Sequence, residues 1–447
     1  MRLPGALPCA LAALIALGTP VRADYLETRR SAILEASVRD GLALETLQVG
    51  TLLELSEGPQ ENGYYPVRTR ERRSGFVYRT LVRRHPGALP PALGGDPAPA
   101  EPGASNDPGD PAPSGPRLRV HLIDVGQGAA TLLEFPCGAA LIDTGGETNG
   151  DFDSAAALRA YLDQFFNERQ DLNRSLDLLA ITHPHIDHAR NVRWLTQEYS
   201  VRNVVTNGMP RSPSGNFYSG GLAQAWLEDW AREHARLETI EAARVPAGGA
   251  SSDVIDPLRC PDVDPAIRVL WGRLDAPGEL SATAFANAND HSVVFRVDFG
   301  RSSFLVSGDL EVDALPALLE KHRGTDALDI DVWQVSHHGS ANGTERALLD
   351  ALTPEVALLA TGAPTREGVF TAWAYGHPRE TVIQQLLAAL PRDDPFRRTR
   401  RNRVPMGIAV KDFETVDVGE AIYATGWDGS VIVSADANGG YRIWTER

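Results

Sequence analysis

The chain has 447 residues, enough for two or three domains, and 43% of them are apolar, as in an ordinary globular protein. Its formal net charge of -16 argues against a protein that coats nucleic acid non-specifically, although a local basic groove remains compatible with it. We expect no membrane span after the first 23 residues, because no later segment is long and apolar enough.

The first 23 residues have the pattern of a secretory signal peptide. Arg2 gives a positive start, a mostly apolar stretch extends to Leu17, and Ala23 ends a short segment before a cleavage site. The stretch is short for an uncleaved anchor, so we expect a periplasmic or secreted protein. In an oxidising compartment Cys137 and Cys260 could form one disulfide, but the sequence does not show that they meet.

Residues 24–85 contain short strand patterns between turns and predict a small all-β barrel. The motifs at 49–51, 63–67 and 75–78 resemble a bacterial Src-homology-3-like domain. The resemblance implies a contact with cell-wall peptidoglycan rather than chemistry. The alternative is a barrel that only stabilises its neighbour.

The segment 86–117 is dominated by Pro, Gly, Ala and Asp, and it predicts a linker without a core of its own. From residue 118 to 447, strand and helix patterns alternate. Strands are expected at 118–123, 139–142, 178–181, 292–297 and 302–306, and helices at 155–166 and 223–237. This alternation predicts a layered α/β domain.

The most informative motif is the run Thr182-His183-Pro184-His185-Ile186-Asp187-His188, which directly follows the strand expected at 178–181. A loop leaving a strand can direct such neighbours to two points, His183 and His185 to one metal ion and Asp187 and His188 to another. Imidazole and carboxylate suit zinc. Two ions about 3.5–4 Å apart can hold a hydroxide between them. Without ions, burying such a cluster would cost free energy.

Other polar residues also follow apolar strand patterns. Asp143 ends one strand and could hydrogen-bond a metal-bound imidazole from behind. Asp309 ends another and could bridge two ions. The pair His337-His338 also comes after an apolar strand pattern, and His377 adds one more histidine later in the chain. Their repeated position predicts one edge of a sheet sandwich, where loops form a site.

These segments resemble the metallo-β-lactamase superfamily, and more narrowly the hydrolase domain of ComEC-type competence proteins. The matching motifs are Asp124-Val125-Gly126-Gln127-Gly128, Leu141-Ile142-Asp143-Thr144-Gly145, the histidine run, Ser307-Gly308-Asp309-Leu310-Glu311, His337-His338-Gly339-Ser340 and Tyr375-Gly376-His377-Pro378. The resemblance covers residues 118–436 and implies an αββα sandwich with two metal ions, zinc or manganese, at one edge.

Carried over residue by residue, the resemblance gives one ion to His183 and His185. The other ion is given to Asp187, His188 and His377, with Asp309 bridging the two. Asp187, His337 and His338 are the implied catalytic residues, and the two histidines act as proton donor or phosphate contact. Which of the three late histidines binds metal stays open. A third ligand for the first ion is expected between His188 and Asp309, with His291 the better candidate and His234 the other.

Two features depart from the family pattern. Ala189-Arg190 follow the histidine run where the family commonly has two glycines, and Arg190 could narrow the pocket or bind an anion. An insertion near 391–418 contains the basic run 396–403, which could grip a phosphate backbone or stay solvated. The membrane channel of competence proteins is not among the segments that match.

The leading functional hypothesis is a secreted dinuclear metal-dependent phosphodiesterase or nuclease that uses a metal-bridging hydroxide. Its substrate would be nucleic acid or a phosphodiester polymer of the cell surface. A second hypothesis is lactone or amide hydrolysis, including β-lactams, because a fold alone does not decide the reaction. A third is a catalytically weak cell-wall-binding protein.

Overall fold

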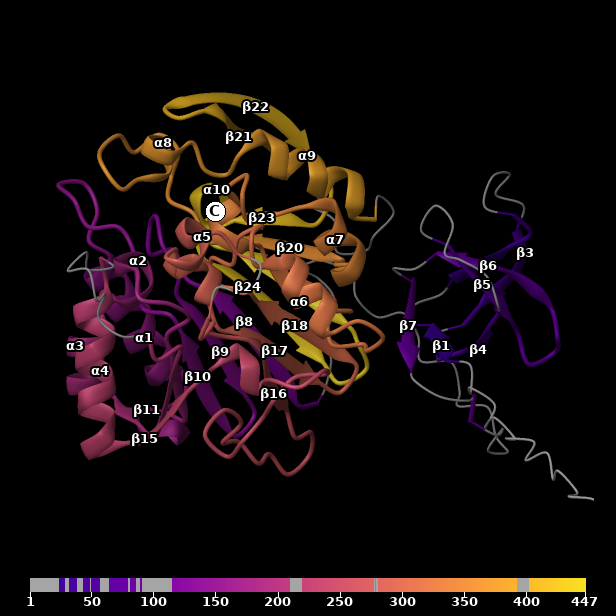
Figure 1. Ribbon diagram of the computed structural model, residues 1–447, viewed down its shortest axis with the longest axis horizontal. Coiled ribbons are helices and arrows are strands. Elements are labelled where there is room, and N and C mark those ends of the chain that lie inside the picture. Colours follow the sequence, from indigo (N-terminus) through magenta and orange to yellow (C-terminus); the bar gives the residue numbers. More distant parts are fainter. Residues whose placement is uncertain are drawn as a thin grey trace, which may run out of the picture.

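The computed structural model describes residues 24–28, 32–37, 43–48, 50–56, 64–78, 81–85, 89–90, 115–209, 219–276, 278, 280–391 and 402–447. The expected signal peptide (1–23), most of the expected linker (86–117) and most of the basic run 396–403 lie outside these residues. Figure 1 shows a small all-strand unit beside a larger layered unit.

The small unit is an antiparallel sheet of seven strands. In sheet order they are β3 (Ala43–Leu47), β2 (Ala32–Glu35), β6 (Ser74–Tyr78), β5 (Tyr64–Arg68), β4 (Leu52–Leu55), β1 (Tyr25–Thr28) and β7 (Val82–His85). Leu26, Leu34 and Leu53 are fully buried in its small core. The all-β character expected for this unit is confirmed.

The large unit contains an eight-stranded mixed sheet. Its strands, in the order in which they lie side by side, are β15 (Arg236–Thr239), β14 (Asn203–Thr206), β12 (Leu178–Ala180), β10 (Gly138–Ile142), β9 (Thr131–Phe135), β8 (Arg117–Leu122), β24 (Val431–Asp436) and β25 (Tyr441–Thr445). Strands β10, β12, β14 and β15 are parallel, and the remaining neighbours are antiparallel. Every residue of β10 and β12 is buried, as expected for strands covered on both faces.

A second, six-stranded sheet packs against the first. Its order is β16 (Ala266–Trp271), β17 (Val294–Phe299), β18 (Ser302–Val306), β19 (Val332–Gln334), β20 (Val356–Leu359) and β23 (Ile422–Ala424). The hairpin expected around Gly300 is β17–β18. One buried apolar cluster contains Phe135 and Leu133 of the first sheet together with Phe295 and Trp333 of the second, so the main core lies between the sheets.

Helices cover the outer faces of both sheets (Figure 1). Those on the first sheet are α1 (Ser154–Glu168), α3 (Val192–Glu198) and α4 (Gly221–His234), and those on the second are α6 (Leu315–Lys321), α7 (Arg346–Leu352) and α9 (Glu380–Ala389). Leu158 and Leu227 share a buried cluster with Leu179 of β12. Leu349 and Ile383 belong to the large cluster that also contains Trp333 of the second sheet. The expected αββα sandwich is therefore confirmed.

Shorter elements complete the domain. They are β11 (Ser175–Leu176), β13 (Ser200–Val201), α2 (Ile186–Ala189), α5 (Ala282–Phe285), α8 (Ala372–Tyr375), α10 (Thr425–Asp428) and the hairpin β21 (Asn402–Ala409) to β22 (Asp412–Val418). The hairpin forms the top of the molecule in Figure 1, close to α9. The end of the basic run, Asn402 and Arg403, thus begins an ordered strand.

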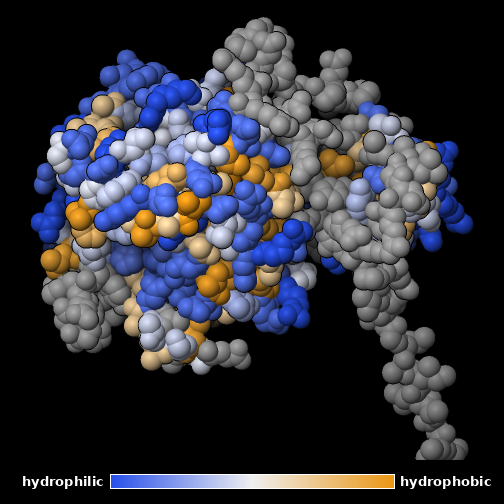
Figure 2. All heavy atoms as spheres, turned by 90° about the horizontal axis from the view of Figure 1, so that it is seen from above, coloured by the Kyte–Doolittle hydropathy of each residue, from blue (hydrophilic) through white to orange (hydrophobic). Residues whose placement is uncertain are grey.

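A disulfide joins Cys137, in the turn between β9 and β10, to Cys260, in the loop before β16, with the Cα atoms 5.4 Å apart. The crosslink ties the first sheet to the segment that leads into the second. None of the described helices is long and apolar enough to span a bilayer. Figure 2 shows a face on which hydrophobic side chains are scattered among hydrophilic ones, as is usual for surfaces that face water.

The ends of the parallel strands define two edges of the sandwich. At the carboxyl edge, β10, β12, β18 and β19 are followed within three residues by Asp143, His183, Asp309 and His337, respectively. At the opposite, amino edge, β18 and β19 begin. Polar side chains from two sheets therefore meet at one edge, as the sequence predicted.

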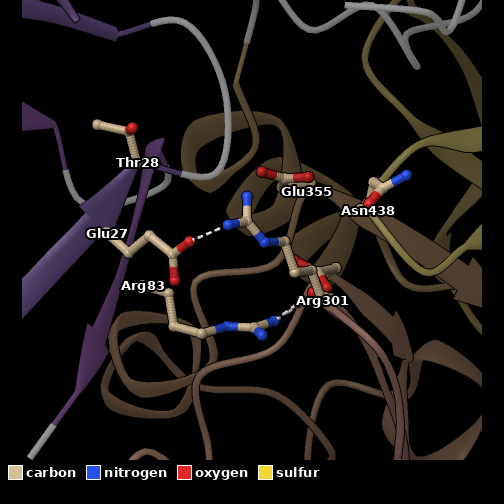
Figure 3. A pocket seen from close by; sticks show the side chains of 8 residues that line it. Glu27, Thr28, Arg83, Arg301, Glu355 and Asn438 are labelled. Atoms are coloured by element: carbon tan, nitrogen blue, oxygen red, sulfur yellow. Dashed lines mark hydrogen bonds and ion pairs between the residues drawn. The ribbon is translucent and has the colours of Figure 1, made fainter. Parts of the chain in front are cut away.

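The small unit contacts the amino edge (Figure 3). Glu27 of β1 forms an ion pair with Arg301, and a guanidinium nitrogen of Arg83 in β7 donates to the carbonyl oxygen of Arg301 at 2.6 Å. The same nitrogen of Arg83 lies 3.5 Å from Oδ2 of Asp331. The barrel contact and the site loops thus lie at opposite edges of the second sheet.

Candidate metal centre

The loops of the carboxyl edge have an unusual backbone. Asp143, His337 and His338 have φ angles of 61°, 50° and 54°, in the left-handed region, which costs a non-glycine residue about 1–3 kcal/mol. Such conformations concentrate at functional sites, where the surrounding structure holds them. Gly145 allows a close approach, because a Cβ there would lie 1.5 Å from the carbonyl oxygen of Asp187.

The first group of metal-capable atoms comes from His183, His185 and Asp309, and the three ligand atoms lie within 4.8 Å of one another. Nε2 of His183 lies 3.0 Å from Nδ1 of His185 and 3.8 Å from Oδ2 of Asp309. The histidines follow β12 and the aspartate follows β18, so this group joins the two sheets.

The second group comes from Asp187, His188, Asp309 and His338, also within 4.8 Å of one another. Nε2 of His338 lies 3.4 Å from Oδ2 of Asp187 and 3.3 Å from Oδ2 of Asp309. Nε2 of His188 lies 3.2 Å from Oδ1 of Asp309. Because Asp309 belongs to both groups, its carboxylate could serve as a ligand to an ion in each.

Hydrogen bonds behind the second group fix its imidazoles. Nδ1 of His188 lies 2.7 Å from Oδ2 of Asp143, which in turn accepts from the hydroxyl of Thr182 at 2.9 Å. Nδ1 of His338 lies 2.7 Å from the carbonyl oxygen of Ala360. Both Nδ1 atoms therefore carry the proton, which leaves the Nε2 lone pairs for a metal, as is usual for metal-ligating histidines. Asp143 thus makes the contact expected of it.

The buried charges also fit a cation site. Burial lowers the pKa of His183 and of His185, which favours neutral imidazoles. Burial acts in the same direction on His188 and His338, but the Asp309 carboxylate, together with Asp143 at His188 and Asp187 at His338, outweighs it, so the pKa of His188 lies well above its usual value and that of His338 rises to about 10. The carboxylate thus favours positive charge around it, and divalent ions can supply that charge in place of protons.

His377 differs from the sequence-based expectation, which placed it in the second group. Its Nδ1 lies 3.2 Å from the side-chain nitrogen of Gln127, and its ring stacks on Tyr375 with centroids 5.5 Å apart. Its ring centroid is 6.3 Å from that of His338, and it belongs to neither group. His338 takes the position that was expected for His377, because the left-handed turn at 337–338 directs its ring between Asp187 and Asp309.

His291, the further candidate for the first group, is engaged elsewhere. Its Nδ1 accepts from the backbone N–H of Leu274 at 3.0 Å, and its Nε2 donates to the carbonyl oxygen of Phe285 at 2.8 Å. Both ring nitrogens are used, so no lone pair is left for a metal. The structure therefore leaves His291 outside the first group. His234, the other candidate, is exposed at the end of α4.

His337 lies beside the two groups without joining either. Its Nε2 is 3.9 Å from Oδ2 of Asp309, its Nδ1 is 3.2 Å from Oε1 of Glu311, and 20% of its side chain is exposed. This position between the bridging aspartate and the pocket suits a group that exchanges a proton with a substrate.

A pocket of about 290 Å³ opens onto both groups, and His185, Asp187, Asp309, His337 and His338 line it. Arg190 lines the same pocket and donates from Nε to the carbonyl oxygen of Gly146 at 3.0 Å. Two aromatic residues line it as well, Phe370, which is 68% exposed, and Tyr375, which is 38% exposed. The pocket therefore combines cation-binding groups, a guanidinium and exposed aromatic rings.

Sequence patterns did not identify three residues of the site as functional candidates. Glu311 contacts His337, Gln127 contacts His377, and Asn289 lines the pocket. Glu311 and Gln127 stand within motifs that carried the family resemblance, which was the available signal. Asn289 has no such signal, because a single asparagine is common in loops and its role depends on tertiary contacts.

Two groups of imidazoles and carboxylates share one aspartate at the edge of an αββα sandwich. This arrangement is typical of the metal sites of metal-dependent hydrolases. The family model of the metallo-beta-lactamase superfamily matches residues 123–363, more than half of the chain. The chain belongs to this superfamily, whose members are generally metal-dependent hydrolases.

The curated relatives include "Competence protein ComA" of Neisseria gonorrhoeae, which is 34% identical over 100 residues, a match that covers 22% of this chain and 13% of that protein. The chain is 26% identical over 277 residues to "ComE operon protein 3" of Bacillus subtilis, a match that covers 60% of this chain and 30% of that protein. It is 25% identical over 273 residues to "Recombination protein 2" of Haemophilus influenzae, covering 61% of this chain and 27% of the relative. The chain thus spans less than a third of the length of these relatives.

Solved structures with detectable similarity include the metallo-beta-lactamase fold protein YhfI from Bacillus subtilis, with 10% identity, a TM-score of 0.33 and coverage of 61% of this chain and 93% of that one. Another is MEM-A1, a subclass B3 metallo-beta-lactamase from a soil metagenome library, with 13% identity, a TM-score of 0.29 and coverage of 49% and 76%.

Proposed function

We propose that this protein is a dinuclear metal-dependent phosphodiesterase that acts on nucleic acid. The observation that carries the proposal is the shared aspartate, because Asp309 belongs to both groups of ligand atoms. Two ions held by one carboxylate lie close enough to engage a single phosphodiester group.

The residues of each group would hold one divalent ion, zinc or manganese. His183, His185 and Asp309 would hold the first, and Asp187, His188, Asp309 and His338 the second. Two such ions supply Lewis acidity for phosphoryl oxygens and lower the pKa of a water molecule. The donor set fits borderline divalent ions, because it combines imidazole nitrogen with carboxylate oxygen, and four of its six members, His183, His188, Asp309 and His338, are buried.

His337 would donate a proton to the leaving oxygen of the substrate. Its side chain lines the pocket and is 20% exposed, and Oε1 of Glu311 lies 3.2 Å from Nδ1, so the carboxylate can orient the ring. His377 lines the same pocket beside His338 and would limit the movement of that ring by packing. Its ring plane lies 26° from that of His338.

The walls of the pocket support a nucleic-acid substrate. The guanidinium of Arg190 is placed to contact a phosphate next to the scissile one, and the rings of Phe370 and Tyr375 offer faces on which bases can stack. Two relatives carry names that refer to competence and recombination, which agrees with this substrate class. A phosphodiester polymer of the cell surface is the other substrate that such a pocket admits.

A substrate screen tests the proposal. Protein loaded with zinc or with manganese should cleave bis(p-nitrophenyl) phosphate and single-stranded DNA, and His185→Ala should abolish both activities. His234→Ala is the matched control, because His234 is exposed and outside the site. Rapid turnover of nitrocefin by protein that leaves both phosphodiesters intact would overturn the proposal in favour of β-lactam hydrolysis.

We also propose that the chain is exported and that the barrel contacts peptidoglycan. The signal-like pattern of residues 1–23 and the disulfide between Cys137 and Cys260 support an oxidising compartment outside the cytoplasm. The full-length protein should sediment with purified peptidoglycan, and failure to do so would remove the wall-contact role. Mass spectrometry of the exported protein should give an N-terminus at Asp24.

A further inference from the structure

The first group has fewer ligands than the second. Among the histidines, cysteines and carboxylates of the described residues, only His183, His185 and Asp309 contribute to it, and Asp309 is shared. The second group has four ligands. The first ion would therefore have one protein ligand fewer than a tetrahedral structural site, and His291 does not supply it.

Asn289 is held next to this group. It belongs to the short 3-10 turn Ala288–His291 and lines the pocket together with His185 and Asp309. The chain just after it lies between the two ligand loops. The hydroxyl of Ser292 accepts from the backbone N–H of Asp309 at 3.2 Å, and Val293 donates its N–H to the carbonyl oxygen of Thr182 at 2.9 Å.

The amide of Asn289 is oriented by a carboxylate. Its Nδ2 donates to Oε1 of Glu311 at 2.5 Å, which places the amide oxygen on the other side. The residue is only 5% exposed, and its Oδ1 has no hydrogen-bond partner among the described residues. A buried carbonyl oxygen without a partner is unfavourable, and in a pocket lined by metal-capable residues it has the chemistry of a cation ligand.

We propose that Oδ1 of Asn289 is the missing protein ligand of the first metal ion, a role that rests on the proposed dinuclear site. The first ion would then have two imidazole nitrogens, one carboxylate oxygen and one amide oxygen. Amide and carboxylate oxygens are hard ligands that suit manganese or magnesium better than zinc. The second site, with two imidazoles and two carboxylates, carries one more negatively charged ligand and would bind its ion more tightly.

A competing role can be separated from this one. Asn289 could act only through Glu311, by holding the carboxylate that orients His337. That role predicts a lower kcat with unchanged metal affinity, whereas a ligand role predicts loss of one of the two ions.

The experiment measures metal binding by the full-length protein, with manganese and with zinc, by competitive chelator titration and by metal analysis after dialysis. Asn289→Ala should keep one tight ion and weaken the other at least about tenfold, with the larger loss for manganese. Asn289→His should restore two ions and shift the weakened site towards zinc, which also guards against a variant that merely misfolds.

Asn203→Ala is the matched control. Asn203 is 4% exposed, has an unpartnered Oδ1 and donates from Nδ2 to the carbonyl oxygen of Asp177, but it lies at the far, amino end of β14. The Asn203→Ala variant should bind two ions like the unaltered protein. Two ions of unchanged affinity in Asn289→Ala, or equal losses in Asn203→Ala, would overturn the inference. Because the readout is metal affinity, it does not depend on whether phosphodiesters are the substrate.

Discussion

Two buried aspartates at opposite edges of the second sheet have different kinds of partners. At the amino edge, Asp331 accepts from the backbone N–H of Ser303 and from the hydroxyl of Tyr441, each at 2.6 Å, and Arg83 lies 3.5 Å away. At the carboxyl edge, the partners of Asp309 are ring nitrogens of four histidines, at 3.2 to 3.9 Å.

The difference separates a structural carboxylate from a functional one. The protein's own donors satisfy Asp331, so its burial is compensated within the fold. Asp309 is compensated only if neighbouring imidazoles carry protons or if cations bind, and those imidazoles are better ligands when they are neutral. The same sandwich thus contacts the barrel at one edge and brings its metal-capable side chains together at the other.

The largest expected effect is that of Asp309→Ala on activity. Removing the shared carboxylate should lower kcat/KM for bis(p-nitrophenyl) phosphate by at least about 10³-fold, because both ions lose a ligand. Steady-state kinetics with added zinc or manganese measures this loss. Activity within tenfold of the unaltered protein would show that Asp309 does not bridge two ions.

Asp331→Ala should lower the stability of the fold and leave the activity almost unchanged, whereas Asp309→Ala should remove the activity. Asp331→Ala leaves the guanidinium of Arg83 and the hydroxyl of Tyr441 without their buried partner, so the free energy of unfolding should fall by about 3 kcal/mol. The folded variant should keep its kcat within about threefold, since the amino edge is remote from the reaction. Urea denaturation measures the first quantity. A loss of activity without a loss of stability would show that Asp331 is not a purely structural carboxylate.

Glu134 is a third carboxylate whose partners lie within the fold, and it should affect the stability of the fold at acid pH. Burial raises its pKa, but the bond to His121 and the charge of Arg119 more than offset this and hold the pKa at about 2, below the ordinary 4.5. A carboxyl with a lowered folded-state pKa stabilises the fold above pH 4.5, and this contribution is lost as pH falls from about 4.5 to about 2. Thermal unfolding across this range should show the loss, and Glu134→Gln should show a flatter profile.

The smallest effect is expected at the barrel contact. Arg301 is 44% exposed in its ion pair with Glu27, so Arg301→Ala should change the free energy of unfolding by less than about 1 kcal/mol. Phosphodiesterase activity should be unchanged. Small-angle scattering should show whether the barrel separates from the sandwich in the variant. A large loss of activity would mean that the amino edge is coupled to the site.

The strands that carry ligands were predictable because their signals are local. The apolar segment at 178–181 and the polar run after it lie within a dozen residues, so strand, loop and ligand types could be read together. Asp143 and Asp309 were identified in the same way, each at the end of an apolar strand. The αββα arrangement followed from these motifs and their order rather than from periodicity alone.

Other features depend on contacts between distant segments. Strands β24 and β25 extend the first sheet next to β8, although more than 300 residues separate Leu122 from Val431 in the sequence. The choice of His338 over His377 depends on a left-handed turn. The helix expected to run to residue 237 ends at His234, because the next residues pair with β14 as β15. These outcomes depend on tertiary pairing, which overrides local pattern.

The most direct test of the account is the position of bound metal in crystals grown with zinc or with manganese. Anomalous difference maps should show two peaks, one between His183, His185 and Asp309 and the other among Asp187, His188, Asp309 and His338. Their separation should be about 3.5–4 Å. Maps with no peak at the carboxyl edge, or with a peak that does not contact Asp309, would contradict the account.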